Sequence, residues 1–402
     1  MAGRVENQYT EIFRQLEFKN GTDIFAEYIL PDTTEKRKEE IEENIFTIMR
    51  EVNKVPMNVW DDRVIQESLR QLSDIPSVTL YNDGNYGFNP VGVNVLNYFF
   101  PELLDVRKPS CPLSIRDSFY DDKKLKRAIK KTLRYGGNEL DIFKWLRIGG
   151  AGYCVNFRPA TAKAIYEIFG KREDCKVFDS SSGYGARMLG AHFASNVREY
   201  VGIDPNTANH CGDEIEYLDK WFDTNTKKHV YEMGSEDFTS EAFPQYQDYF
   251  DIAFTSPPYF NTEMYSDAPT QSWKKFPTYV GWVDGFYKNT IYNTIDALKV
   301  EGIFSINIFE KVPNIRELTK LYAANKGFFL YKNDKYLLRT MPGGCKDSEG
   351  NIVSRERVTG DNFEPIWMFR HYSVLLRDGL ITEEKAFEYK ARASMDKKAP
   401  VL

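Results

Sequence analysis

CKVFDSSSGYG, residues 175–185, is an apolar, β-prone run that ends in an aspartate and a glycine-rich turn. A helix-forming segment with Met188, Leu189 and Ala191 follows it. A strand that enters a helix through such a turn brings main chain close to a ligand lying across the strand ends, although a GxG alone also suits a purely structural turn. We expect four residues of this stretch at a binding site: Asp179, Ser181, Gly183 and Gly185.

Six more β-prone runs follow, and the first four of them are separated by helical or turn segments. This alternation predicts right-handed crossovers and a parallel sheet covered on both faces. The last two runs lack a helix-length connection and should pair antiparallel, at or near the edge. We predict an α/β fold with a Rossmann-like, doubly wound, mostly parallel seven-stranded sheet. Its later strands are expected at 200–205, 229–237, 250–258, 302–310, 328–338 and 364–371.

Residues 1–150 differ from the rest and predict a largely helical N-terminal domain with a recognition or accessory role. Apolar residues recur at helical spacing in 41–52, and Leu125, Ile129 and Leu133 form a second stripe. Residues 75–115, rich in Pro, Asn, Gly and aromatics, are expected to be irregular. The sheet should occupy residues 151–375, with a C-terminal helix and tail at 376–402.

Composition narrows the class of protein. A chain of 402 residues with 42% hydrophobic residues can form two or three globular domains. The net charge of −6 counts mildly against a nucleic-acid partner, but a local basic surface can coexist with acidic flanks. The five Cys and four His are scattered without a CxxC pair, which predicts neither disulfides nor a metal site. No apolar run is long enough for a membrane, so we expect a cytoplasmic protein.

Two acidic residues follow later strands of the predicted sheet. Asp204 ends the strand after the glycine-rich turn, where a carboxylate suits the hydroxyls of a ribose. Asp237 follows the next strand, near where an adenine amino group would lie. Each is also a plausible helix N-cap. Their shared position at the carboxyl ends of successive strands favours the binding interpretation.

The run at 250–260, FDIAFTSPPYF, carries the most specific motif in the chain. Ser256, Pro257, Pro258 and Tyr259 stand where the fourth strand ends. Two consecutive prolines cannot donate to a sheet and fix a rigid, extended turn. A catalytic function for this turn competes with a purely structural one.

Thr-Ser-Pro-Pro-Tyr-Phe at 255–260 resembles the catalytic motif of the amino-methyltransferases that form N6-methyladenine or N4-methylcytosine in DNA. The resemblance covers residues 150–371 and implies S-adenosylmethionine as the cofactor. A dinucleotide would require a third glycine where Met188 stands. The family commonly has Pro-Phe after its aspartate, whereas this chain has Ser180-Ser181, so another aromatic such as Phe157 must compensate. The segment similar to the family's cover over the methionine end of the cofactor is Asn156, Phe157, Arg158 and Pro159.

The resemblance implies chemistry on an exocyclic amine of a base flipped out of duplex DNA. The Ser256 hydroxyl and the Pro257 carbonyl would accept hydrogen bonds from the amine, so that its lone pair faces the methyl group. Tyr259 or Phe260 would stack on the base. Three alternatives remain: an RNA base as acceptor, a glutamine amide in a protein, or a catalytically silent binding protein with the same fold.

Further segments could contact the substrate. The loop after the motif interleaves aromatics with lysines and offers Tyr265, Trp273, Lys274 and Lys275, although Phe276, Tyr279 and Trp282 could simply dock the next helix. The loop at 340–362 is long enough to be functional. The helix expected at 121–135 has either a phosphate-binding face or a solvated one. Its basic residues are Lys123, Lys124, Lys126, Arg127, Lys130, Lys131 and Arg134.

Overall fold

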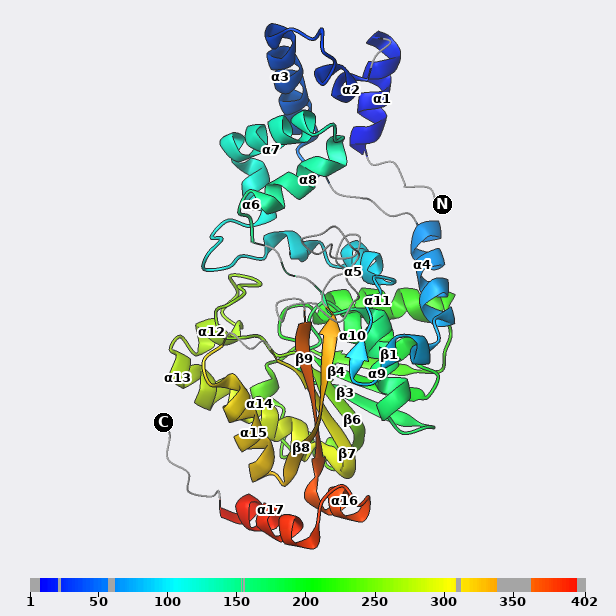
Figure 1. Ribbon diagram of the computed structural model, residues 1–402, viewed down its shortest axis with the longest axis vertical. Helices are drawn as coiled ribbons and strands as arrows, with labels where there is room; N and C mark the ends of the chain where they lie inside the picture. The colour runs from blue at the N-terminus through cyan, green and yellow to red at the C-terminus, as the bar shows by residue number, and fades with distance from the viewer. Residues whose placement is uncertain are drawn as a thin grey trace, which may run out of the picture. The chain divides into compact units, whose positions relative to one another are not determined.

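The structure is a computed structural model that describes residues 8–20, 23–56, 62–152, 154, 156–308, 312–337 and 363–395. The chain forms two compact units (Figure 1). The first, here the helical unit, comprises Met1–Glu67, Phe100–Val155 and Asn261–Asp267. The second, the sheet unit, comprises Ser68–Phe99, Asn156–Phe260 and Ala268–Leu402. The predicted loop at 340–362 and the tail from 396 onward lie outside the described residues.

The helical unit forms because apolar residues at helical spacing give its helices one buried face each. Ile41, Ile45 and Met49 of α3 pack with Ile129 and Leu133 of α7 in one core. Side-chain caps fix where helices begin, as in the capping boxes before α6 and α8. Its helices are α1 (Gln8–Asn20), α2 (Ile24–Tyr28), α3 (Glu35–Val52), η2 (Pro101–Asp105), α6 (Ile115–Tyr120), α7 (Asp122–Arg134) and α8 (Glu139–Ile148).

The sheet unit contains one mixed sheet in the order β1-β2-β8-β9-β7-β6-β3-β4-β5. All seven predicted strands form, and the predicted α/β, doubly wound and mostly parallel class is confirmed. The strands are β1 (Tyr81–Asn82), β2 (Asn85–Tyr86), β3 (Cys175–Asp179), β4 (Val197–Ile203), β5 (Lys227–Tyr231), β6 (Phe250–Thr255), β7 (Leu298–Asn307), β8 (Phe328–Leu337) and β9 (Phe363–His371).

The predicted number of seven strands is wrong, because a small hairpin extends the sheet to nine. β1 and β2 have two residues each and are joined by Asp83-Gly84, both at positive φ. An Asp-Gly pair of this kind favours a tight hairpin, but strands this short give no alternating pattern. β8 and β9 pair antiparallel as expected, while β2 pairs with the other side of β8, so β8 is not an edge strand.

Helices cover both faces of the sheet, with α14 and α15 on one side and α9, α10 and α11 on the other (Figure 1). One hydrophobic core of the sheet unit includes Phe178 of β3, Phe304 of β7 and Trp282. The helices are η1 (Ser77–Thr79), α5 (Val93–Phe99), α9 (Pro159–Phe169), α10 (Ala186–His192), α11 (Ala208–Trp221), η3 (Ser235–Asp237), η4 (Pro244–Tyr246), α12 (Ser272–Lys275), α13 (Tyr279–Trp282), η5 (Val283–Tyr287), α14 (Lys288–Asp296), α15 (Ile315–Asn325), α16 (Tyr372–Arg377) and α17 (Glu383–Met395).

The division into units differs from the predicted boundary at residue 150. α4 (Asp62–Asp74) crosses from the helical to the sheet unit, and Ser68–Phe99 belongs to the sheet unit. Buried Lys163 of α9 holds this segment, since its Nζ donates to the carbonyls of Leu72, Ser73 and Ile75 at 3.1, 2.7 and 2.9 Å. The apolar helix pattern around Lys163 did not predict that this lysine would bind three main-chain carbonyls. Among the described helices, none is both long and apolar enough to cross a membrane.

Glu214 of α11 is a buried acid inside this framework. Its side chain has 0% exposure, and neither carboxylate oxygen has a hydrogen-bond partner among the described residues. Burial raises the pKa of Glu214 well above its usual value of 4.5, and nearby Lys228 only partly opposes this shift. The folded protein therefore holds Glu214 protonated at pH values where the unfolded chain ionises it.

Because the pKa of Glu214 is raised in the fold, the free energy of unfolding should fall as pH rises above about 4.5. We predict that Glu214→Gln raises the Tm at pH 8 by about 2–4 °C or more and leaves it nearly unchanged at pH 4. Thermal unfolding followed by circular dichroism at both pH values tests this. Glu216→Gln, on the exposed side of the same helix, is the control. Equal gains at the two pH values would contradict the prediction.

Candidate functional site

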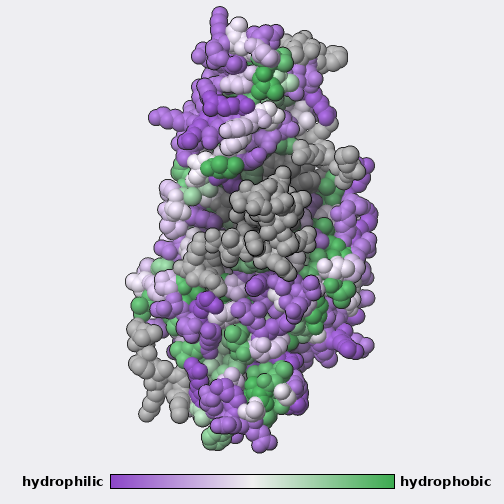
Figure 2. All heavy atoms as spheres, in the orientation of Figure 1, coloured by the Kyte–Doolittle hydropathy of each residue, from purple (hydrophilic) through white to green (hydrophobic). Residues whose placement is uncertain are grey.

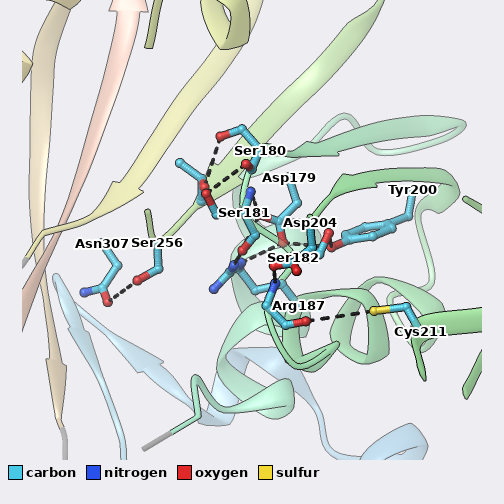
Figure 3. A network of polar contacts seen from close by, with 12 residues as sticks. Asp179, Ser180, Ser181, Ser182, Arg187, Tyr200, Asp204, Cys211, Ser256 and Asn307 are labelled. Atoms are coloured by element: carbon cyan, nitrogen blue, oxygen red, sulfur yellow. Dashed lines mark hydrogen bonds and ion pairs between the residues drawn. The ribbon is translucent and has the colours of Figure 1, made fainter. Parts of the chain in front are cut away.

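The glycine-rich turn and the Ser-Pro-Pro-Tyr motif lie side by side at the carboxyl ends of β3 and β6. These strands pair in parallel, with Val177 opposite Ile252. Ser180, the residue after β3, donates its hydroxyl to Oγ1 of Thr255, the last residue of β6, at 3.1 Å. Figure 3 shows Ser180 and Ser256 among the polar residues of this region. β4 and β5 extend the sheet from β3, whereas β7 extends it from β6, so this is the point where the strand order reverses. Doubly wound sheets bind their ligands at such a point.

A buried ion pair fixes the turn. Asp179, with 0% exposure, accepts from Arg187 Nε at 2.7 Å, from Arg187 Nη2 at 3.2 Å and from the Tyr200 hydroxyl at 2.7 Å. Its Oδ1 also accepts from the Ser181 amide, and Arg187 donates to the Ser181 carbonyl. Burial lowers the pKa of Arg187, but the charge and hydrogen bonds of nearby Asp179 oppose this shift, and the pKa is raised overall. The guanidinium therefore stays protonated. Asp179 thus anchors the turn from inside.

Gly183 and Gly185 adopt the left-handed conformation, with φ of 55° and 70°, which glycine accepts without a Cβ clash. The Gly183 amide donates to Asp204 Oδ2 at 3.1 Å, while the amides of Asn206 and Thr207 donate to Oδ1 at 2.8 Å each. Burial raises the pKa of Asp204, and these bonds oppose the shift. The Asp204 carboxylate therefore connects the turn to the start of α11. Of these three bonds, Oδ1 accepts two and Oδ2 accepts one.

After β5, helix η3 presents two acids that pair with a lysine of α12. Lys275 Nζ lies 2.7 Å from both Glu236 Oε1 and Asp237 Oδ2. Partial burial lowers the pKa of Lys275, but the two carboxylates raise it overall. Asp237 is 59% exposed, whereas Glu236 is buried and its Oε2 has no hydrogen-bond partner among the described residues. The sequence analysis selected Asp237, and the structure adds its neighbour Glu236 as a buried acid with one unpaired oxygen among the described residues.

The segment before α9 is locked into the sheet unit by aromatic contacts. The Phe157 ring stacks on Tyr336 at 4.5 Å and meets Phe254 edge-on at 5.1 Å. The guanidinium of buried Arg158 lies 4.0 Å from the Phe88 ring and donates to the Leu337 carbonyl. Asn156 is partly exposed, and Pro159 begins α9. The polar side chain of this segment that remains accessible is thus Asn156.

Asn307, the last residue of β7, organises the motif. The Tyr259 hydroxyl donates to the Asn307 carbonyl at 2.7 Å, and Ser256 Oγ makes a long 3.4 Å contact with Asn307 Oδ1. The Asn307 amide donates to the Pro365 carbonyl at 3.1 Å. The Tyr259 hydroxyl directs its proton at Asn307 and so does not donate it to Ser256 Oγ, which lies 3.4 Å from the Tyr259 oxygen. The lone pairs of Ser256 Oγ therefore remain available as acceptors. Sequence reasoning missed Asn307, although a polar residue at the end of an apolar run was a usable signal.

Other predicted substrate residues lie in different environments. Phe260 has φ of 53° and packs 5.8 Å from Tyr279 and 5.9 Å from Trp282. Trp282 is fully buried and donates to Ser272 Oγ at 3.1 Å, so it docks its helix onto the core. Lys274 lies 5.3 Å from the Trp273 ring on α12, a short helix that also carries Lys275.

Tyr265 belongs to the helical unit, with the rest of Asn261–Asp267. Its hydroxyl donates to Glu263 Oε2 at 2.6 Å, and Met264 exchanges two main-chain hydrogen bonds with Arg107. Arg107 also pairs with Asp267 at 3.0 Å. The chain directly after the motif is therefore anchored in the helical unit. In the described part of the chain, no three His, Cys, Asp or Glu side chains are grouped as metal ligands.

No family model matches the sequence, and no curated protein matches it. The solved structures that it resembles include a TehB-like SAM-dependent methyltransferase from Corynebacterium glutamicum, 11% identical, with a TM-score of 0.31 over 61% of this chain and 98% of that one. TrmN from Thermus thermophilus is 13% identical, with a TM-score of 0.32 over 53% and 48%. A branched-chain polyamine synthase mutein from the same organism is 10% identical, with a TM-score of 0.35 over 53% and 55%. At these scores the fold assignment rests on the strand order and pairing of this chain.

Removing one partner of the buried ion pair should leave an uncompensated charge in the core. We predict that Arg187→Met lowers the free energy of unfolding by about 3–5 kcal/mol, measured by urea unfolding. The double variant Asp179→Asn with Arg187→Met should recover part of this loss, because it removes both charges. Tyr200→Phe should cost only about 1 kcal/mol. A stability of Arg187→Met within about 1 kcal/mol of the parent would refute the anchoring role.

Proposed function

We propose that this protein is an S-adenosylmethionine-dependent methyltransferase that modifies the exocyclic amino group of adenine or cytosine in DNA. One observation carries the proposal: Ser256 and Tyr259 present neutral hydroxyl oxygens beside the glycine-rich turn, at the reversal point of a doubly wound sheet. A strand-end turn of this kind suits a cofactor, and the Ser256 hydroxyl beside it suits an amine.

The residues at the strand ends fit an adenosine-containing cofactor. Glu236 Oε2, a buried acceptor without a partner among the described residues, suits the amino group of an adenine. Asp204 Oδ2, bonded to the Gly183 amide, suits a ribose hydroxyl. Asn156 and Ser181 are partly exposed and can serve the polar end. When bound, S-adenosylmethionine supplies an electrophilic methyl group on its sulfonium.

Positioning is the chemistry that the motif can perform. An exocyclic amine is a poor nucleophile because its lone pair is delocalised into the ring, so acceptors for its N–H groups favour a pyramidal nitrogen. Ser256 Oγ and the Pro257 carbonyl are the proposed acceptors, with Tyr259 as the stacking ring. In the transfer, the nitrogen would form a bond to the methyl carbon while the bond from the sulfonium sulfur to that carbon breaks and leaves a thioether, and the nitrogen would release one proton to solvent. Orientation of this kind can supply much of the rate enhancement.

The acceptor can be identified by incubating the protein with tritiated S-adenosylmethionine and either unmethylated duplex DNA or total tRNA, followed by digestion to nucleosides. We expect label in methyladenine or methylcytosine from DNA. Ser256→Ala should lower kcat by about 10²–10³-fold, as the loss of a positioned hydrogen bond does. Ser394→Ala, at an exposed position of α17, is the matched control. Label in RNA alone, or in the protein itself, would replace DNA by an RNA base or a glutamine amide as the acceptor.

The Asn307 side chain should act through the Ser256 hydroxyl that it contacts, since Tyr259 bonds to the Asn307 main-chain carbonyl, which a substitution leaves in place. We predict that Asn307→Ala lowers kcat about 10–100-fold while KM for DNA changes less than threefold, because binding survives and alignment is lost. Asn307→Asp, which keeps an acceptor for Ser256 but cannot donate to the Pro365 carbonyl, should fall between Ala and the parent. Steady-state kinetics at matched stability measure this. A change confined to KM would contradict the orienting role.

A further inference from the structure

Helix α7 carries basic residues on two distinct parts of its surface. Its buried face consists of Leu125, Ala128, Ile129, Thr132 and Leu133. At 100° per residue the seven cations occupy the remaining surface. They differ in what neutralises them, and this difference separates them into two groups.

One group is neutralised by α3. Lys126 Nζ lies 2.8 Å from Glu43, and Lys130 Nζ lies 3.4 Å from Glu42. Lys126 also lies 4.3 Å from the Phe46 ring. These two lysines join neighbouring helices, so they are explained by the packing of the helical unit.

The other group has no such explanation. Among the described residues, none of its five cations pairs with a carboxylate, and on the helix they fall within about 100° of one another. We call this group the basic stripe: Lys123, Lys124, Arg127, Lys131 and Arg134. In Figure 2 hydrophilic residues cover most of the surface over α3 and α7 in that view.

An aromatic pair, exposed Tyr135 on partly buried Trp145, adjoins the C-terminal end of the stripe. Tyr135, 70% exposed, stacks on Trp145 at 5.1 Å with the ring planes 20° apart. Lys131 and Lys144 lie 5.0 and 5.6 Å from the Trp145 ring. A flat ring held at the surface among cations can stack on a base or sugar while the cations contact phosphates.

We propose that the basic stripe binds the phosphate backbone of duplex DNA. This inference rests on the proposed function, for which it supplies sequence-independent positioning. From Lys123 to Arg134 the helix rises about 17 Å, which spans about five phosphates along one strand of B-form DNA. Five unpaired cations therefore match the charge of the backbone that they face. The overall charge of −6 does not prevent this, because phosphate binding depends on the local field.

The stripe predicts a difference between two matched double variants. Lys123→Gln with Lys124→Gln removes two stripe lysines, whereas Lys126→Gln with Lys130→Gln removes the two paired lysines of the same helix. Binding of a fluorescein-labelled 30-base-pair duplex is measured by anisotropy from 50 to 300 mM salt. The stripe variant should bind about tenfold more weakly at low salt, with the slope of log Kd against log salt reduced by about 2. The control variant should bind within about twofold of the parent.

The assay requires neither cofactor nor methyl transfer, so its outcome is independent of the catalytic proposal. If the stripe variant loses DNA binding while Ser256→Ala leaves DNA labelling unchanged, the stripe stands and the motif assignment fails. Equal affinity of the two double variants, with unchanged Tm, would overturn the stripe proposal. Preferential binding of total tRNA over the duplex, lost in the stripe variant, would also overturn it in favour of RNA.

Discussion

The buried pair of Asp179 and Arg187 is the interaction on which the site depends. Two charges removed from water are costly unless they are paired and hydrogen-bonded, and here Tyr200 and the main chain of Ser181 add bonds to those within the pair. The pair therefore admits one arrangement of the turn after β3. Because that turn also bonds to Asp204, the ends of β3 and β4 are fixed together.

Hydrogen bonds connect the turn that this ion pair fixes to the neighbouring strands. Ser180 joins the turn to Thr255, and the next residue begins the Ser-Pro-Pro-Tyr motif. Asn307 then connects the motif to β7 and, through the Pro365 carbonyl, to β9. Four strands thus hold one row of polar groups at the edge where a doubly wound sheet binds ligands. The prolines contribute by keeping this edge free of ladder hydrogen bonds.

Sequence patterns predicted the seven longer strands, because apolar runs at the spacing of crossover connections are a strong signal. They did not predict β1 and β2, whose two-residue length carries no period. Arg187 was missed because one charge within an apolar helix shows its partner only in three dimensions. The adjacent acids Glu236 and Asp237 look alike in sequence, and only the structure shows that Glu236 is buried and Asp237 exposed.

The two units show different uses of charge within one acidic chain. In the sheet unit, cations such as Arg187 and Lys275 are bound by carboxylates and fix local geometry. On α7 the carboxylates of α3 reach one edge only, and five cations have no carboxylate partner in the part of the chain that the structure describes. Like charges spaced along one helix repel one another, and exposed cations of this kind weaken the fold unless a polyanion offsets them. The proposed DNA-binding surface gives a reason for their concentration on a single stripe, which the packing of α7 against α3 does not.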